Sequence, residues 1–142
     1  KMCIWDFNSA CDNYSHPVTE PQHFELQYNV WYYMLSKDED FINAVIERYR
    51  ALRQGVLSDA YLNGYMDAVV EWLGPAVDRN FSVWGYALDK DMISPAERNP
   101  HTHTEAVAQM KRFCAERGAW MDEHIDILRQ YSHESKNKKF NH

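Results

Sequence analysis

Apolar residues recur every three or four positions along most of the chain between residues 30 and 131. This spacing places them on one face of an α-helix, because the helix completes a turn every 3.6 residues. Residues 38–54 are typical, with apolar side chains at positions 41, 42, 45, 46, 49 and 52. The pattern predicts a mainly α fold: a bundle or array of four to five helices, preceded by a short strand and a loop.

Capping residues and helix breakers set the expected boundaries. Residues with N-cap chemistry precede three of the apolar stripes. They are Ser36 (with Glu39) or Asp38 before the second helix, Ser58 before the third, and Thr102 with Glu105 before the last. The Gly74-Pro75 pair ends or kinks the third helix, because proline lacks an amide hydrogen. The predicted helices cover residues 30–35, 38–54, 58–73, 76–85 and 103–131.

The third helix carries an aromatic-rich set that we expect to face inward. Glycine at position 64 destabilises this helix by about 1 kcal/mol relative to alanine. Its presence therefore predicts that another helix packs closely against this position. The expected inward-facing residues are Tyr61, Leu62, Tyr65, Met66, Val69, Trp72 and Leu73.

The chain divides into three parts on this basis. Residues 1–29 form the strand and loop, residues 30–131 the helical region, and residues 132–142 a polar tail. An apolar content of 45% indicates a folded domain, and a formal charge of -6 gives no electrostatic footprint for nucleic acid. No apolar run approaches the roughly 20 residues that a membrane-spanning helix needs.

Three cysteines are present, an odd number without a CxxC pair, which disfavours a zinc ribbon. Cys3 and Cys11 would meet if the intervening chain turned back, and an oxidising compartment would permit a bridge between them. Cys114 lies on the apolar face of the last predicted helix, where a small core residue is expected.

The first residues carry the most concentrated candidate chemistry. Met2–Trp5 is a strand-like apolar run, and Asp6 ends it. A carboxylate in such a place needs a partner, because a buried unpaired charge is costly. With Asn8, and with Asp12 and Asn13 beyond, it offers oxygen ligands for a hard cation. The alternative is a carboxylate that caps the following turn.

Other metal sites have weaker support in the sequence. His101 and His103 alternate, but no Cys, Asp or Glu lies at a recognisable zinc-ligand spacing from them. The acidic residues of the 122–126 segment, next to His124, are expected to form a solvated stripe. A small metal-dependent hydrolase built on Asp6, Asp12 and the histidines is a separate hypothesis.

Several segments together resemble the C-terminal part of the CotH-type kinases, atypical protein kinases named after a spore-coat protein. The N-terminal one, Trp5-Asp6-Phe7-Asn8-Ser9-Ala10-Cys11, is similar to a family segment of the form WD-(F/L/Y)-(D/N)-x-x-(F/L)-G. Others follow in order within the helical region, and the resemblance covers residues 2 to about 130. They are Tyr49–Ser58, Arg79–Trp84, Met110–Phe113 and Arg117–Asp122.

The resemblance implies that Asp6 holds magnesium beside the phosphates of ATP, with Asn8 as the second ligand where many relatives have aspartate. Cys11 stands where the family commonly has glycine. The family's nucleotide-binding lysine and catalytic aspartate lie upstream of these segments. The helices would then form a C-terminal lobe, in which Arg53, Arg79 and Arg117 make internal ion pairs or substrate contacts.

The resulting hypothesis is a C-terminal fragment of a CotH-like kinase that is inactive alone. The parent would transfer a phosphoryl group from ATP, with magnesium, to a protein, and relatives of this kind are often extracytoplasmic. The alternative is a non-catalytic structural or interaction module of a cell-envelope protein.

Overall fold

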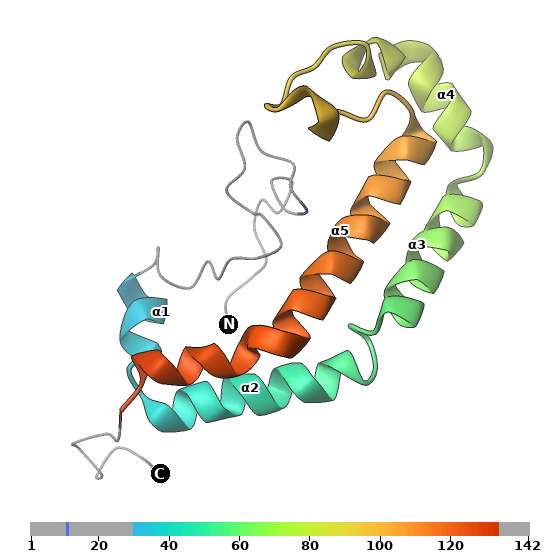
Figure 1. Cartoon of the computed structure of the whole chain (residues 1–142). Coiled ribbons are helices and arrows are strands. Elements are labelled where there is room, and N and C mark those ends of the chain that lie inside the picture. The colour runs from blue at the N-terminus through green and yellow to red at the C-terminus, as the bar shows by residue number, and fades with distance from the viewer. Residues whose placement is uncertain (1–10, 12–29, 134–142) are drawn as a thin grey trace.

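The computed structural model describes Cys11 and residues 30–133, and the latter range is mainly helical, with an irregular connector before the last α-helix (Figure 1). This confirms the predicted mainly α fold, whereas the strand and loop expected over residues 1–29 lie outside the described residues, apart from Cys11. Five α-helices and three 3₁₀ segments succeed one another between residues 30 and 131. They are α1 (Val30–Leu35), α2 (Glu39–Arg53), α3 (Asp59–Leu73), α4 (Pro75–Trp84), η3 (Gly85–Leu88), η4 (Ala96–Arg98), α5 (His103–His124) and η5 (Ile125–Tyr131).

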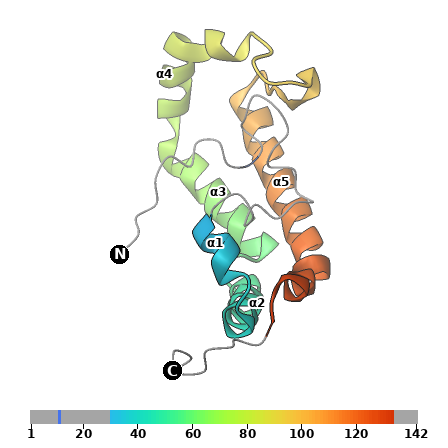
Figure 2. The same ribbon diagram turned by 90° about the vertical axis from the view of Figure 1, so that its left-hand side faces the viewer.

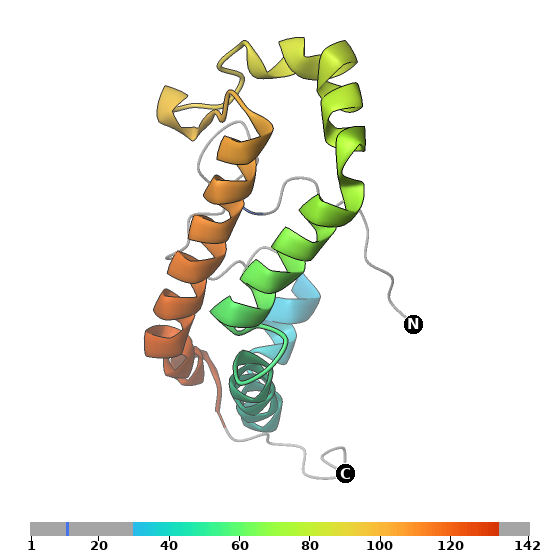
Figure 3. The ribbon, with the colours of Figure 1, turned by 90° about the vertical axis from the view of Figure 1, so that its right-hand side faces the viewer.

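The helices form an elongated array with its core at one end. In Figure 1, α2 and η5 run side by side at the base, and α3 and α5 rise from them. Figures 2 and 3 show α3 and α5 next to each other along their length, with α4 and the connector to α5 at the far end. None of the helices in the described part is long and apolar enough to cross a bilayer.

The predicted caps open three of the helices. Asp38 caps α2, because its Oδ1 accepts from the Phe41 amide at 2.8 Å, while the Ser36 hydroxyl donates to the Tyr33 carbonyl instead. Ser58 caps α3 and Thr102 caps α5 through contacts of 3.2 and 3.1 Å with backbone amides. The helix starts therefore follow from local hydrogen bonding of the kind that the sequence predicts.

The break between α3 and α4 falls at the Gly74-Pro75 pair. Gly74 has a φ of 46°, a left-handed conformation that glycine adopts without a Cβ clash. Pro75 is the first residue of α4, where its missing amide hydrogen leaves no helical bond unmade. The chain therefore turns between two helices at the place where the pair predicts it.

The last helix is shorter than predicted. It was expected to continue to Tyr131, but α5 ends at His124 and the chain continues as the 3₁₀ segment η5. Side chains three positions apart line up on a 3₁₀ helix, which has three residues per turn. Ile125 and Leu128 are thereby both buried against α2.

The hydrophobic core lies where α2 crosses η5. Ile42 and Ile46 from α2 meet Ile125 and Leu128 from η5, and all four are almost completely buried. Partly buried neighbours pack around them: Phe41, Val45, Tyr49 and Met121. The α2 stripe predicted from the sequence is therefore the centre of the fold.

The inward face predicted for α3 is partly wrong. Tyr61, Tyr65, Trp72 and Leu73 are exposed, and 83% of Trp72 is accessible to solvent. Gly64 lies on the same helix between these residues, and a Cβ added there would meet nothing within 4 Å, so no other element of the described part packs closely against it. Two neighbouring apolar stripes run along α3. Leu62, Met66 and Val69 form the half-buried one, and α3 packs against α5.

The face predicted for α1 is also uncovered by the described residues. Trp31, Met34 and Leu35 were expected to form one apolar face, and all three are exposed. Helical periodicity marks such faces but does not say whether a neighbouring element covers them.

Candidate functional site

The residues predicted to hold metal, Asp6 and Asn8, lie outside the described residues. The same holds for Asp12, Asn13, His16 and His23. Within the described part of the chain, no three His, Cys, Asp or Glu side chains gather closely enough to hold a metal ion. The most elaborate polar arrangement there is a junction of three helices around Arg53.

Arg53 joins α2 to the other two long helices. Its Nε donates to both oxygens of Asp122 on α5, at 3.1 and 2.9 Å. Its Nη1 donates to Oδ1 of Asp59, the first residue of α3, and to the Leu57 carbonyl, both at 2.7 Å. Only 13% of the Arg53 side chain is exposed, whereas its two carboxylate partners are about half exposed. The guanidinium group is thus held by two acids and a carbonyl at one point.

Gly118 allows α5 to approach the guanidinium of Arg53. A Cβ at this position would lie 2.6 Å from Nη2 and 2.7 Å from Cζ of Arg53. Glycine within a helix costs about 1 kcal/mol relative to alanine. That cost has a structural reason here, because any side chain would displace the guanidinium. The close helix packing that the sequence predicts at Gly64 is not found there. A close approach between helices occurs at Gly118 instead.

Tyr49 completes the junction from one turn earlier on α2. Its hydroxyl group donates to Oδ1 of Asp122 at 2.7 Å, and the Gly118 carbonyl lies 3.2 Å away as a second, longer acceptor. Burial, and then the hydrogen bond and charge of Asp122, raise the pKa of the Tyr49 phenol well above its ordinary value. The phenol therefore stays protonated and serves as a donor to the carboxylate rather than as an acid or base.

Most of this junction differs from what the sequence predicts. The acids of the 122–126 segment were expected to form a solvated stripe, but Asp122 pairs with Arg53, and Asp126 pairs with both Arg50 and Arg129. A usable signal was present: Arg50 and Arg53 lie one turn apart on α2, and Asp122 and Asp126 have a similar spacing near the end of the last predicted helix. The internal ion pair expected of Arg53 is confirmed.

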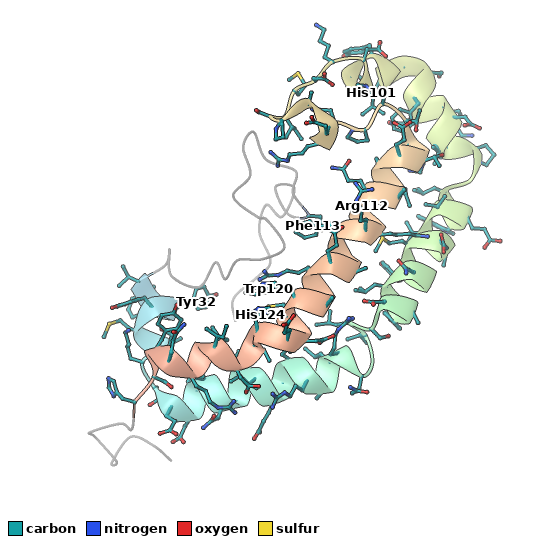
Figure 4. The ribbon with its side chains drawn as sticks, in the orientation of Figure 1. Tyr32, His101, Arg112, Phe113, Trp120 and His124 are labelled. Atoms are coloured by element: carbon teal, nitrogen blue, oxygen red, sulfur yellow. The ribbon has the colours of Figure 1, made fainter. Side chains whose placement is uncertain are left out.

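Aromatic side chains also project from α5 on the side that faces away from the Arg53 junction. Phe113 and Trp120 project from the side of α5 that is turned away from α3 (Figure 4). The rings of Trp120 and His124 stack with centroids 4.6 Å apart and planes inclined by 6°. The Arg117 guanidinium lies 5.3 Å from the centre of the Trp120 ring, a cation–π distance. Arg117 and His124 are therefore held by ring contacts. Arg79 is exposed on α4.

The two remaining histidines near the connector make local contacts. Nδ1 of His101 lies 2.7 Å from the Leu88 carbonyl, and Nε2 lies 3.5 Å from Asp91. The ring of His103 packs beside Phe81 with centroids 5.6 Å apart. A capping box predicts that the Glu105 side chain accepts from the amide of Thr102. It accepts from the His101 amide instead, at 2.8 Å. These contacts fasten the connector to the start of α5.

Residues 30–133 thus form a mainly helical scaffold, and Arg53 joins its three long helices, α2, α3 and α5. Two of the segments behind the family resemblance meet there, Tyr49–Ser58 on one side and Arg117–Asp122 on the other. A family model described as CotH kinase protein matches residues 1–121. The chain belongs to this family, which confirms the resemblance. No match was found among curated proteins or among solved structures.

Proposed function

We propose that the chain is the C-terminal part of a CotH-like kinase, which transfers a phosphoryl group from ATP, with magnesium, to a protein. The family match over residues 1–121 is the observation that carries the proposal. The nucleotide-binding lysine and the catalytic aspartate would come from residues upstream of Lys1. The chain alone would then be inactive.

Asp6 and Asn8 are the residues that would hold the magnesium ion. The chemistry of this pair suits the ion, because carboxylate and amide oxygens are the hard ligands that magnesium prefers. When bound, the ion would neutralise the phosphate charge that shifts during transfer. Asn8 contributes a neutral oxygen, so the pair offers one negative charge, and an Asn8→Asp variant should bind magnesium more tightly.

The helical region would support this site as a lobe. The Arg53 junction fixes α2, α3 and α5 relative to one another, with the buried core of α2 and η5 beside it. A site built on a rigid support keeps its ligands in place at a small entropic cost. This assigns the helices a supporting role and the segment around Asp6 a chemical one.

The test compares the isolated chain with the protein extended by its upstream residues. We expect magnesium-dependent ATP consumption and transfer of labelled γ-phosphate to protein only in the extended form. Asp6→Ala should lower the transfer rate at least about 100-fold, because a metal contributes several kcal/mol of charge stabilisation. Asp78→Ala, which removes an exposed carboxylate of α4, is the matched control and should leave the rate unchanged.

Two results would contradict the proposal. An extended protein that consumes no ATP in the presence of magnesium would favour a non-catalytic structural or interaction module of the cell envelope. Micromolar binding of magnesium–ATP by the isolated chain, measured by calorimetry, would show that the nucleotide site does not need upstream residues.

A further inference from the structure

An apolar groove, open to solvent, runs along the flank of α2 beside the hydrophobic core. Its volume is about 490 Å³, and the large apolar residues that line it are Phe41, Val45, Tyr49, Leu52 and Leu57. From Phe41 to Leu52 the helix rises roughly 16 Å, or about three turns, at about 1.5 Å per residue. Phe41, Val45 and Tyr49 also pack against the buried core of α2 and η5, which fixes one side of the groove before anything binds. The groove is therefore a preformed apolar surface with the length of a short helix.

One cation, Arg48, lies midway along this groove and has no carboxylate partner within the described residues. Side chains three and four positions away are neighbours on a helix surface, and those around Arg48 are all apolar. They are Ala44, Val45, Ala51 and Leu52. The other two arginines of α2, Arg50 and Arg53, both pair with carboxylates. Arg48 is exposed, so it places an unpaired positive charge at the centre of an apolar surface.

The length of the groove and the charge within it indicate the chemistry of an occupant. We propose that the groove binds an amphipathic helix of another polypeptide, whose apolar face carries one acidic residue that pairs with Arg48. About three turns of helix match the groove in length, and apolar side chains spaced three and four residues apart would fill it. The acid supplies the partner that α2 itself does not provide. This proposal does not depend on the kinase activity proposed above.

A second copy of this chain matches the groove less well. The faces of this chain that are apolar and left uncovered by the described residues include α1 and the outer stripe of α3. The segment of α1 contains no acidic residue, and Gly64 and Ala68 separate the exposed aromatic residues of α3. Neither face therefore offers a carboxylate at its centre. A single acyl chain is narrower than a helix and would leave the open side of the groove in contact with water.

Arg48 would select among helices of similar hydrophobicity. When a helix covers the groove, the guanidinium loses water, and its interactions with other charges strengthen as the local dielectric constant falls. An acid in the facing position compensates for the lost water through a charge-assisted hydrogen bond. A neutral or basic residue there leaves the guanidinium buried without a partner, which is costly. The groove should therefore discriminate by charge and not by apolar area alone.

The first experiment uses two synthetic helical peptides of about four turns, identical except for glutamate or lysine at the centre of a leucine face. We expect the glutamate peptide to bind the whole chain at least about tenfold more tightly in fluorescence anisotropy. Arg48→Glu should reverse this order. Arg79→Glu, which alters an exposed arginine of α4, should leave it unchanged. Circular dichroism checks that both variants are folded. Equal affinities, binding of neither peptide, or an order that Arg48→Glu does not change would each overturn the proposal.

A second experiment supplies Arg48 with a partner from its own helix. Ala44 is exposed and lies one turn before Arg48, so Ala44→Glu adds an acid at the favourable i, i+4 spacing. This variant should bind the glutamate peptide at least about fivefold more weakly than Ala44→Gln, which has the same size without the charge. Equal losses would refute the pairing. Self-association that Arg48→Glu abolishes, or binding of dodecanoate as tight as that of the glutamate peptide, would assign the groove to another occupant and overturn the proposal.

Discussion

The guanidinium of Arg53 occupies the space that a side chain at Gly118 would fill. A Cβ added to Gly118 would lie 2.6 Å from Nη2 of Arg53, which is closer than two such atoms can approach. An arginine at the surface could swing away at little cost. This one is held by Asp122, Asp59 and the Leu57 carbonyl, so moving it breaks several hydrogen bonds at once.

Gly118→Ala should therefore destabilise the protein although alanine favours helix. We expect the free energy of unfolding to fall by about 1–3 kcal/mol, the usual cost of overpacking. Gly64→Ala is the matched control, because it is also within a helix but its Cβ would meet nothing within 4 Å. That variant should gain up to about 1 kcal/mol. Urea unfolding of the two variants should give opposite signs, and equal signs would show that Arg53 does not restrict Gly118.

The same relationship predicts coupling between the two positions. In an Arg53→Ala background the space beside Gly118 is free, so Gly118→Ala should become neutral or stabilising. A double-mutant cycle measures this coupling directly, and a coupling energy near zero would contradict the contact.

Arg53→Ala should cost more than the loss of another arginine on the same helix. It removes a mostly buried cation and leaves Asp122 and Asp59 without it, which should lower the free energy of unfolding by about 2–3 kcal/mol. Arg50→Ala removes an ion pair with Asp126 that is about half exposed, and should cost no more than about 1 kcal/mol. Equal losses in urea unfolding would indicate that the junction contributes no more than a surface pair.

Tyr49 predicts a loss of stability in alkaline solution. Burial and Asp122 raise the pKa of its phenol in the folded state, whereas in the unfolded chain it titrates near 10. The unfolded state therefore releases its proton first, so the contribution is complete below about pH 9 and is lost as pH rises through 10 and above. Unfolding measured between pH 7 and 12 should show a steeper alkaline decline for the wild type than for Tyr49→Phe. Tyr61→Phe removes the hydroxyl of an exposed tyrosine and should leave the decline unchanged.

Helix starts, and the break between α3 and α4, were the part of the fold that the sequence could predict. Asp38, Ser58 and Thr102 each cap a helix by bonding a backbone amide three residues ahead. Such contacts depend on neighbours in the sequence and need no knowledge of the rest of the fold. The Gly74-Pro75 break is local for the same reason.

Packing between helices was harder to predict, because it depends on residues distant in the sequence. The pairing of Arg53 with Asp122 requires α2 and α5 to meet at one angle, and periodicity does not fix that angle. The burial of Ile125 and Leu128 likewise depends on α2, which is distant in the sequence. For the site, the strand-like run that ends at Asp6 pointed to Asp6 and Asn8 as oxygen ligands, and the family resemblance then implied magnesium. Their role as magnesium ligands stays a prediction.

The two apolar stripes of α2 and α3 should respond differently to mutation, although the sequence gives both the same helical spacing. Ile46 is completely buried against η5, so Ile46→Ala should lower the free energy of unfolding by about 2–4 kcal/mol through lost contacts and a cavity. Trp72 is exposed, so Trp72→Gln removes little buried surface and should change stability by no more than about 0.5 kcal/mol. Both values come from urea unfolding at one temperature. A loss at Trp72 as large as that at Ile46 would mean that this face of α3 is covered in the folded protein, as the periodicity alone predicts.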